Sequence, residues 1–243
     1  MRPELFRLGP LTFHSYGAML ALGILAGVYV AGREARRRGI DPAIIVDFAI
    51  YGILAGLLVS RLLYVGTHLS EYLADPIRML YIHEGGLSLH GGVIGGALVG
   101  IVYARRVRLP FWQLTDIAAP ALPLATGITR IGCFLNGCCY GVPTSLPWGV
   151  YTRYAFGLRH PTQIYEAVLT GLLFWLLWRF RHRARWDGQV FLLYVAIYSA
   201  IRFGVEAFRE VAMLTPWLSV AQAASLAFFT LAAGIWLWRQ RRG

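Results

Sequence analysis

Four side chains with useful acid–base or ionic chemistry interrupt apolar segments of this chain: His90, Arg130, Tyr198 and Arg202. An ionisable residue within a membrane-like segment is costly, so it marks a functional site by default. Arginine presents a planar fork of donors that matches phosphate. Histidine changes charge near neutral pH and can take a proton from a nucleophile. We therefore expect a site in which cations hold an anionic group while a base removes a proton.

The spacing of charges around Arg202 indicates a polar track along one helix. Tyr198, Arg202 and Glu206 lie at i, i+4 intervals and share one face, and Arg209 extends the stripe. The same spacing suits an internal ion pair between Arg202 and Glu206. Together with Arg130, the stripe would supply two cations around one phosphate.

Arg130 has a second interpretation. Charges inside membranes usually pair, so Arg130 could form a salt bridge with Asp116 or Glu166 instead of binding a ligand. Both interpretations stay open from the sequence.

His90 lies in a glycine-rich segment, 85–92, that opens an apolar run. Glycine lets the backbone approach another helix or a lipid head group closely. A histidine in such a place is either a structural hydrogen-bonding residue or a functional group at a membrane entrance.

All three cysteines of the chain are close together in sequence: Cys133, Cys138 and Cys139. They lack the paired C-x₂-C spacing of structural zinc sites, so we predict no metal site. Adjacent cysteines pair with each other only under strain. We expect small buried thiols, and a redox pair formed by Cys138 and Cys139 is the alternative.

Composition places these residues in a membrane protein. Hydrophobic residues make up 57% of the 243 and charged residues only 14%, against roughly 25% charged in soluble domains. The net charge of +11 comes from arginines, with no lysine. These arginines fall in short clusters between apolar runs, which is typical of membrane topology and argues against nucleic-acid binding.

We predict an all-α polytopic protein that forms one integral membrane domain over residues 1–243. A helix needs roughly 20 apolar residues to cross a bilayer. The segment 135–162 contains prolines and glycine that disfavour a continuous helix, and we predict a small periplasmic cap there. Seven spans are predicted, at about 14–32, 43–66, 88–104, 113–134, 163–180, 189–208 and 217–238.

Basic clusters predict the orientation. They follow the first, third, fifth and seventh spans, at 33–38, 105–108, 179–185 and 239–242. Because basic loops stay in the cytoplasm, we expect a periplasmic N-terminus and a cytoplasmic C-terminus. The first apolar run is long enough to span, so we expect no cleavable signal peptide.

Several separated motifs resemble the bacterial phosphatidylglycerol–prolipoprotein diacylglyceryl transferase family, which consists of seven-span inner-membrane enzymes. Residues 14–17 resemble its first-span His-x-Tyr-Gly, and residues 85–92 resemble the element that carries its essential histidine. Residues 159–166 resemble its Arg-His-Pro-Ser-Gln-x-Tyr-Glu. The stripe from Tyr198 to Arg209 matches in type and spacing.

The signature segment 129–141 departs from the family pattern. Gly132, Asn136 and Gly141 are kept, as is Arg130. Cys133 replaces an asparagine and Cys138 replaces a glutamate. The substitutions remove one negative charge near Arg130, which leaves it freer for an anion.

The resemblance implies thioether formation. The thiol of a lipobox cysteine in a preprolipoprotein attacks the glycerol carbon of phosphatidylglycerol, and glycerol 1-phosphate leaves. It implies His90 as base with Tyr198 as helper, and stabilisation of the leaving group by Arg130 and Arg202. No metal or organic cofactor is implied. The remaining residues expected to bind substrate are Tyr16, Gly132, Asn136, Gly141, Glu206 and Arg209.

Three alternatives remain: a divergent relative with another donor or acceptor, a membrane transporter, and a thiol redox protein. Charges that line a path would fit a transporter, but the chain shows no evident internal repeat, which many transporters have. Thiol trapping with and without reductant would identify a redox pair.

Overall fold

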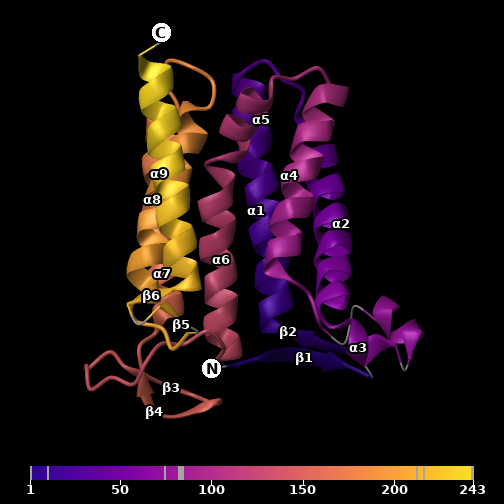
Figure 1. Cartoon of the computed structure of the whole chain (residues 1–243), viewed down its shortest axis with the longest axis vertical. Coiled ribbons are helices and arrows are strands. Elements are labelled where there is room, and N and C mark those ends of the chain that lie inside the picture. Colours follow the sequence, from indigo (N-terminus) through magenta and orange to yellow (C-terminus); the bar gives the residue numbers. More distant parts are fainter. Residues whose placement is uncertain are drawn as a thin grey trace. The chain divides into compact units, whose positions relative to one another are not determined.

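The computed structural model describes residues 2–9, 11–73, 75–81, 85–211, 213–215 and 217–241 (Figure 1). Arg242, in the last basic cluster, lies outside these ranges. The chain forms two compact units, one comprising residues 1–31 and 116–243 and the other residues 32–115. The first is the large unit and the second is the small unit.

The large unit is built from long helices. In it, α6 (Ala121–Asn136) packs along α7 (Thr162–Phe180), α7 along α8 (Gln189–Glu206), and α8 along α9 (Val220–Gln240) (Figure 1). It also contains most of α1 (Ser15–Arg37), which contacts α6. A core of Ala119, Leu173, Leu177 and Val190 joins α7 to α8.

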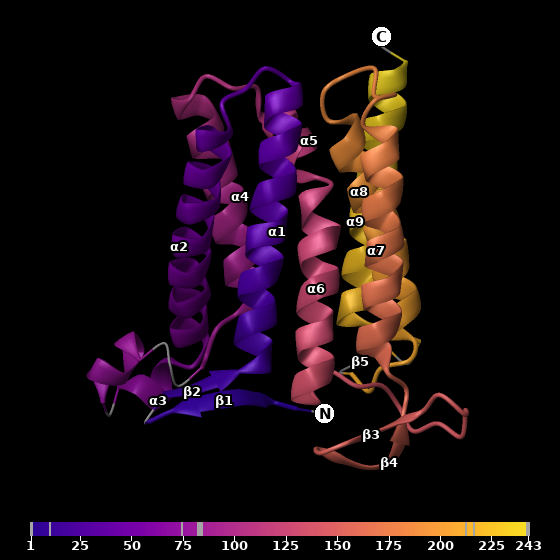
Figure 2. The same ribbon diagram turned by 180° about the vertical axis from the view of Figure 1, so that it is seen from behind.

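In the small unit, α2 (Pro42–Thr67) packs along α4 (Leu89–Arg106) (Figure 2). Two shorter elements, α3 (Leu69–Tyr72) and the 3-10 helix η1 (Pro76–Leu80), lie between them in sequence. Helix α2 begins where expected, because Pro42 occupies its first turn and the Asp41 carboxylate accepts a hydrogen bond from the Ala43 amide at 2.9 Å.

Arg61 of α2 is buried, and it binds main chain instead of a carboxylate. Its guanidinium donates to the carbonyl oxygens of Met79 at 2.8 Å and Gly85 at 2.7 Å, and also to those of Arg78 and Gly86. Arg61 thereby ties the ends of the segment that precedes α4 to α2. Its burial has a structural explanation.

The part of the chain that the structure describes contains three antiparallel hairpins that the all-α prediction omitted. Each consists of two short strands: β1 (Glu4–Leu8) with β2 (Leu11–His14), β3 (Val150–Thr152) with β4 (Ala155–Arg159), and β5 (Met213–Thr215) with β6 (Leu218–Ser219). A hydropathy window of roughly 20 residues averages over strands this short, so they left no signal.

The fold is mostly helical and that of a polytopic membrane protein. Five helical segments of the described chain are long and apolar enough to span: Ser15–Arg37, Pro42–Thr67, Phe111–Asn136, Gln189–Glu206 and Val220–Gln240. The third and fifth predicted spans form α4 and α7, which do not meet this criterion. Glycine dilutes the apolar character of α4, and α7 carries a polar first turn.

The helices differ from the predicted spans at several places. Helix α1 continues to Arg37 instead of ending at 32, and α9 begins at Val220 instead of 217. The fourth span is not one continuous helix but two, α5 (Phe111–Ala118) and α6, separated at Pro120. Proline lacks the amide that would continue the hydrogen-bond ladder. The sixth span ends at Glu206 instead of 208, because the Phe208 carbonyl turns to accept a hydrogen bond from the Val142 amide at 2.9 Å. Arg209 therefore lies beyond α8.

Candidate active site

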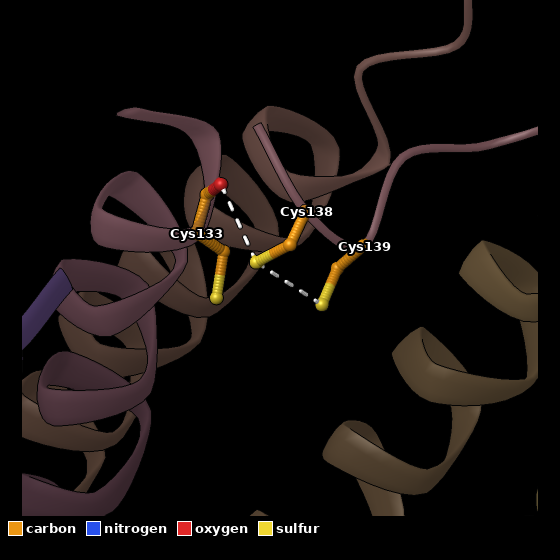
Figure 3. Close-up of side chains that lie close together, drawn as sticks. All are labelled: Cys133, Cys138 and Cys139. Carbon is orange, nitrogen blue, oxygen red and sulfur yellow. Dashed lines mark hydrogen bonds between the residues drawn. The ribbon is translucent and has the colours of Figure 1, made fainter. Parts of the chain in front are cut away.

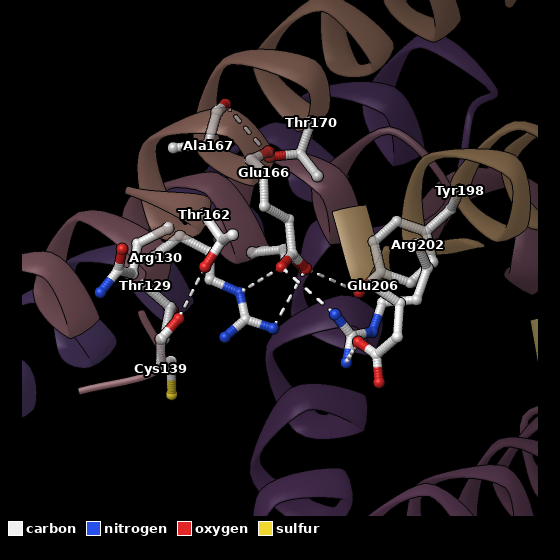
Figure 4. Close-up of polar contacts among 12 residues, drawn as sticks. Thr129, Arg130, Cys139, Thr162, Glu166, Ala167, Thr170, Tyr198, Arg202 and Glu206 are labelled. Carbon is white, nitrogen blue, oxygen red and sulfur yellow. Dashed lines mark hydrogen bonds and ion pairs between the residues drawn. The ribbon is translucent and has the colours of Figure 1, made fainter. Parts of the chain in front are cut away.

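Glu166 of α7 is the centre of a buried polar network in the large unit (Figure 4). Arg130 of α6 approaches its carboxylate with two nitrogens. The Arg130 Nε lies 2.9 Å from Glu166 Oε2, and Nη2 donates a hydrogen bond to Oε1 at 3.1 Å. The pair therefore combines one hydrogen bond, from Nη2, with a close ion-pair contact at Nε.

Helix α8 completes the network from the other side. The Tyr198 hydroxyl donates to Glu166 Oε1 at 3.3 Å, and Arg202 Nη1 lies 3.8 Å from Oε2. Arg202 Nη2 also lies 2.7 Å from Glu206 Oε2. The predicted i, i+4 ion pair within α8 is thus present, and it forms part of a larger arrangement.

The network balances two arginines with two carboxylates. The carboxylates are almost fully buried, whereas the side chains of Arg130 and Arg202 keep 20% and 21% of their surface exposed. The buried carboxylate of Glu166 attracts both guanidinium groups and so offsets the repulsion between them. The accessible cations can still bind an anion from solvent or lipid.

The sequence left open whether Asp116 or Glu166 pairs with Arg130. The structure answers this question. Asp116 instead accepts hydrogen bonds from the amides of Gly188 and Phe191, both at 2.9 Å, at the start of α8. Its carboxylate satisfies helix N-terminal donors.

A polar stripe on α7 positions the turn that follows α6. Thr162 Oγ1 donates to the Cys139 carbonyl at 2.8 Å, and Gln163 Nε2 donates to the Cys138 carbonyl at 2.6 Å. Glu166 follows on the same face at i+4 from Thr162. The segment that resembled a family motif therefore binds both the turn and Arg130.

Gly132 and Asn136 lie on the last two turns of α6. A side chain at Gly132 would meet Met19 Cβ at 2.8 Å and Tyr16 Cα at 3.4 Å, so glycine permits close packing of α6 on α1. Tyr16 itself is 38% exposed. Asn136 ends the helix and hydrogen-bonds the Cys138 thiol.

Gly141 and Arg209 lie beside the end of α8. The Gly141 amide donates to the His160 carbonyl at 2.8 Å, and an added Cβ would meet the Phe208 carbonyl oxygen at 2.2 Å. Only glycine fits where the backbone at residue 141 passes so close to the backbone at residue 208. Arg209 acts electrostatically on Cys139.

The three cysteines gather beside the network as free thiols (Figure 3). A hydrogen bond from the Cys133 thiol and the charges of Arg130 and Arg209 lower the pKa of Cys139 to about 5. Burial raises the pKa of the Cys138 thiol. Cys133 is buried and the other two are half-buried.

His90 belongs to the small unit. It lies in the first turn of α4 and is exposed, next to the capping residue Ser88, whose hydroxyl accepts a hydrogen bond from the Gly91 amide. The predicted close approach of the glycines is present. An added Cβ at Gly91 would lie 2.6 Å from Val59 O, and one at Gly95 would lie 2.6 Å from Ala55 O.

The structure therefore brings Arg130, Tyr198, Arg202 and Glu206 into one network. Sequence reasoning did not include its centre, Glu166, among the site residues, nor did it include Thr162 and Gln163. The sequence does indicate a polar face on α7, because Thr162, Glu166 and Thr170 recur at i, i+4 intervals on a mostly apolar helix.

Comparisons with known proteins identify the family of this chain. The family model described as prolipoprotein diacylglyceryl transferase matches residues 3–238. The chain is 42% identical to phosphatidylglycerol–prolipoprotein diacylglyceryl transferase of Geobacter sulfurreducens, over 94% of this chain and 92% of that protein. The chain is 39% identical to the enzyme of the same name from Clostridium tetani, over 98% of this chain and 97% of that protein. The enzyme of that name from Trichormus variabilis is 35% identical, over 99% of this chain and 91% of that protein. The chain belongs to the prolipoprotein diacylglyceryl transferase family.

Proposed function

We propose that this enzyme transfers the diacylglyceryl group of phosphatidylglycerol to the lipobox cysteine of preprolipoproteins, an early step of lipoprotein maturation. The names of its relatives and the match over nearly the whole chain support this substrate pair. The observation that carries the proposal is the convergence of Arg130 and Arg202 on Glu166.

The reaction breaks the bond between the diacylglyceryl carbon and a phosphate oxygen. The acceptor sulfur forms a new bond to that carbon, and glycerol 1-phosphate leaves with the bonding electron pair. Negative charge therefore grows on the phosphate. Arginine donors directed at developing charge lower the barrier because they need no reorganisation during the reaction. Arg130 and Arg202 are the donors in this proposal.

The thiol must lose its proton to become a good nucleophile. His90 is the proposed base, supported by its exposed position in a glycine-lined first turn. Tyr198 assists by holding Glu166 through its hydroxyl. The proposed substrate contacts are Tyr16, Gly132, Asn136, Gly141, Glu206 and Arg209. The reaction needs no metal, organic cofactor or nucleic acid.

We place the enzyme in the bacterial inner membrane as one domain with seven spans. The N-terminus faces the periplasm and the C-terminus faces the cytoplasm, following the basic clusters. The hairpin of β3 and β4 forms the periplasmic cap, since the segment between α6 and α7 contains no helix.

Transfer by purified protein in detergent tests the proposal. Acyl-labelled phosphatidylglycerol and a lipobox peptide should yield labelled peptide and one glycerol phosphate per thioether. A peptide with serine at the acceptor position and labelled phosphatidylethanolamine are the matched controls, and neither should react. Transfer from the other lipid, or no transfer by folded protein, would favour a relative with a different donor or acceptor.

A further inference from the structure

The thiols of Cys133, Cys138 and Cys139 form a three-sulfur cluster whose atoms all lie within 4.8 Å of one another (Figure 3). The sulfurs of Cys138 and Cys139 are 3.7 Å apart. The cluster is separate from the ion pairs of Glu166, and the transfer chemistry assigns it no role. It therefore needs its own explanation.

The main chain holds the thiols in this arrangement before any ligand arrives. Cys133 is on the last turn of α6, and its carbonyl accepts hydrogen bonds from the amides of Gly137 at 3.0 Å and Cys138 at 3.2 Å. Cys139 adopts a left-handed conformation, with φ of 64°, that is unusual for a residue with a side chain. Thr162 and Gln163 fix the carbonyls of Cys139 and Cys138. A strained residue held by its surroundings is common at binding sites.

The sulfur spacing fits a metal site better than a disulfide. Metal–thiolate bonds of about 2.3 Å place sulfurs about 3.8 to 4.0 Å apart in tetrahedral or trigonal coordination. The 3.7 Å separation between the sulfurs of Cys138 and Cys139 is close to this range, and the other pairs lie within 4.8 Å. A disulfide requires about 2.05 Å, and a bond between the neighbours Cys138 and Cys139 would be strained.

Charge and access also favour a metal thiolate. Three thiolates around a monovalent or divalent ion leave net negative charge, and Arg130 and Arg209 both act electrostatically on Cys139. Cys138 and Cys139 are half-buried, so an ion can reach the cluster. Soft thiolate ligands select closed-shell thiophilic ions over magnesium or calcium.

We propose that Cys133, Cys138 and Cys139 bind one thiophilic d¹⁰ metal ion, Zn(II) or Cu(I), through three thiolates. Each thiol releases its proton to solvent as the metal binds. The bound ion cross-links the end of α6 to the turn that α7 holds. Sequence spacing predicted no metal, because a paired C-x₂-C motif was absent. The left-handed Cys139 is what brings the third sulfur into place.

Metal titration of the purified full chain tests this proposal without reference to transfer activity. The protein is reduced, stripped with a chelator and freed of reductant. Cd(II), added as a spectroscopic probe, should give ultraviolet thiolate-to-metal absorption that saturates at one ion per chain. Competition by Zn(II) and, separately, by Cu(I) held in a chromophoric chelator then identifies the preferred ion. Bound metal should protect all three thiols from alkylation.

Matched variants locate the site. Serine at each cysteine in turn should weaken binding by at least about tenfold, because one of three ligands is lost. Thr162→Val removes the hydrogen bond to the Cys139 carbonyl and should weaken binding, whereas Thr162→Ser keeps the hydroxyl and should not. Loss of a hydrogen bond that holds a metal ligand in place typically costs about 10- to 100-fold in affinity.

Three results would overturn the proposal. The first is absence of saturable one-to-one absorption in the wild-type chain, and the second is an unchanged metal response after all three cysteines are replaced by serine. The third is a disulfide among these cysteines in protein purified without reductant. The wild-type stoichiometry decides the question even if a serine variant fails to fold.

Discussion

A single buried carboxylate, Glu166, holds two arginines from two different helices in one place. Arg130 and Arg202 would otherwise repel each other in a medium of low dielectric constant. Their shared contact with Glu166 offsets this repulsion and keeps both guanidinium groups beside one carboxylate. The proposed chemistry depends on this preorganisation, because positioned charges stabilise a leaving group better than mobile ones.

Glu166→Gln is the sharpest change at this scale. The amide keeps the shape but leaves Arg130 without its charge partner and Arg202 with Glu206 alone, so the free energy of unfolding should fall by about 3 kcal/mol. The transfer rate should also fall, by at least about tenfold, because the arginines lose their orientation. Chemical denaturation in detergent and transfer kinetics measure the two effects.

Glu210→Gln is the matched control. Glu210 pairs with Arg159 at 3.2 Å, but its side chain is 74% exposed. Surface pairs contribute about 1 kcal/mol or less, so both stability and rate should stay near wild type. Equal effects from the two substitutions would contradict the role assigned to Glu166.

Residue identities could be predicted from sequence where charge stands out against apolar surroundings. Arg130 and Arg202, which meet at Glu166, were singled out in this way, and the role of His90 stays a prediction. Glu166 was recognised only as a possible partner, since its central position depends on how α6 and α8 pack against α7. The grouping of the three sulfurs could not be predicted, because it depends on the left-handed conformation of Cys139 and on hydrogen bonds from α7.

At the scale of elements, glycine sets how closely α4 approaches α2. Gly95→Ala should destabilise the protein by about 1–3 kcal/mol, since the new methyl would lie 2.6 Å from Ala55 O of α2. Gly96→Ala is its control on the same helix, with nothing within 4 Å of the added carbon. Thermal unfolding in detergent compares them, and equal midpoints would refute the packing argument.

Gly141 makes a second test at the junction of α6, the β3–β4 segment and α8. Gly141→Ala places a methyl group 2.2 Å from the Phe208 carbonyl oxygen, where backbone cannot yield easily. We expect a loss of about 1–3 kcal/mol and reduced transfer, both measured on detergent-purified protein. Gly171→Ala, in an open position on α7, should be neutral or slightly stabilising. Normal stability of Gly141→Ala would show that the junction adapts.

Hydropathy located the long helices well, with most predicted boundaries within a few residues of the observed ones. It did not locate helix ends that depend on a single proline or on a local hydrogen bond. Pro120 divides the fourth predicted span into α5 and α6, and the turn to Val142 ends α8 at Glu206. The hairpins are stabilised by pairing between strands too short for a span-length window to detect.

For the whole molecule, the arginine clusters predict which end of the chain faces the cytoplasm. A fluorescent protein that folds only in the cytoplasm should fluoresce when fused to the C-terminus. A reporter active only in the periplasm should work when inserted after Trp148, in the proposed cap. The opposite pattern would invert the orientation and place the β3–β4 hairpin in the cytoplasm.

Composition and the arginine clusters were sufficient to predict a polytopic membrane protein, and separated motifs were sufficient to identify the family. The match over residues 3–238 agrees with that resemblance. Cys133 and Cys138 are the positions at which the signature segment differs from the pattern that it resembles. Because Arg130, Tyr198 and Arg202 meet at Glu166, we expect that these cysteines do not abolish transfer.

Arg130, held by Glu166, is proposed to stabilise the departing glycerol phosphate. The most direct measurement is the rate of thioether formation at saturating phosphatidylglycerol for Arg130→Ala, beside Arg183→Ala, which removes an exposed arginine beyond α7. Loss of a donor to developing charge should lower the Arg130→Ala rate about a hundredfold or more. Arg183→Ala should match wild type. A folded Arg130→Ala enzyme that transfers at nearly the wild-type rate would show that Arg130 does not stabilise the leaving group.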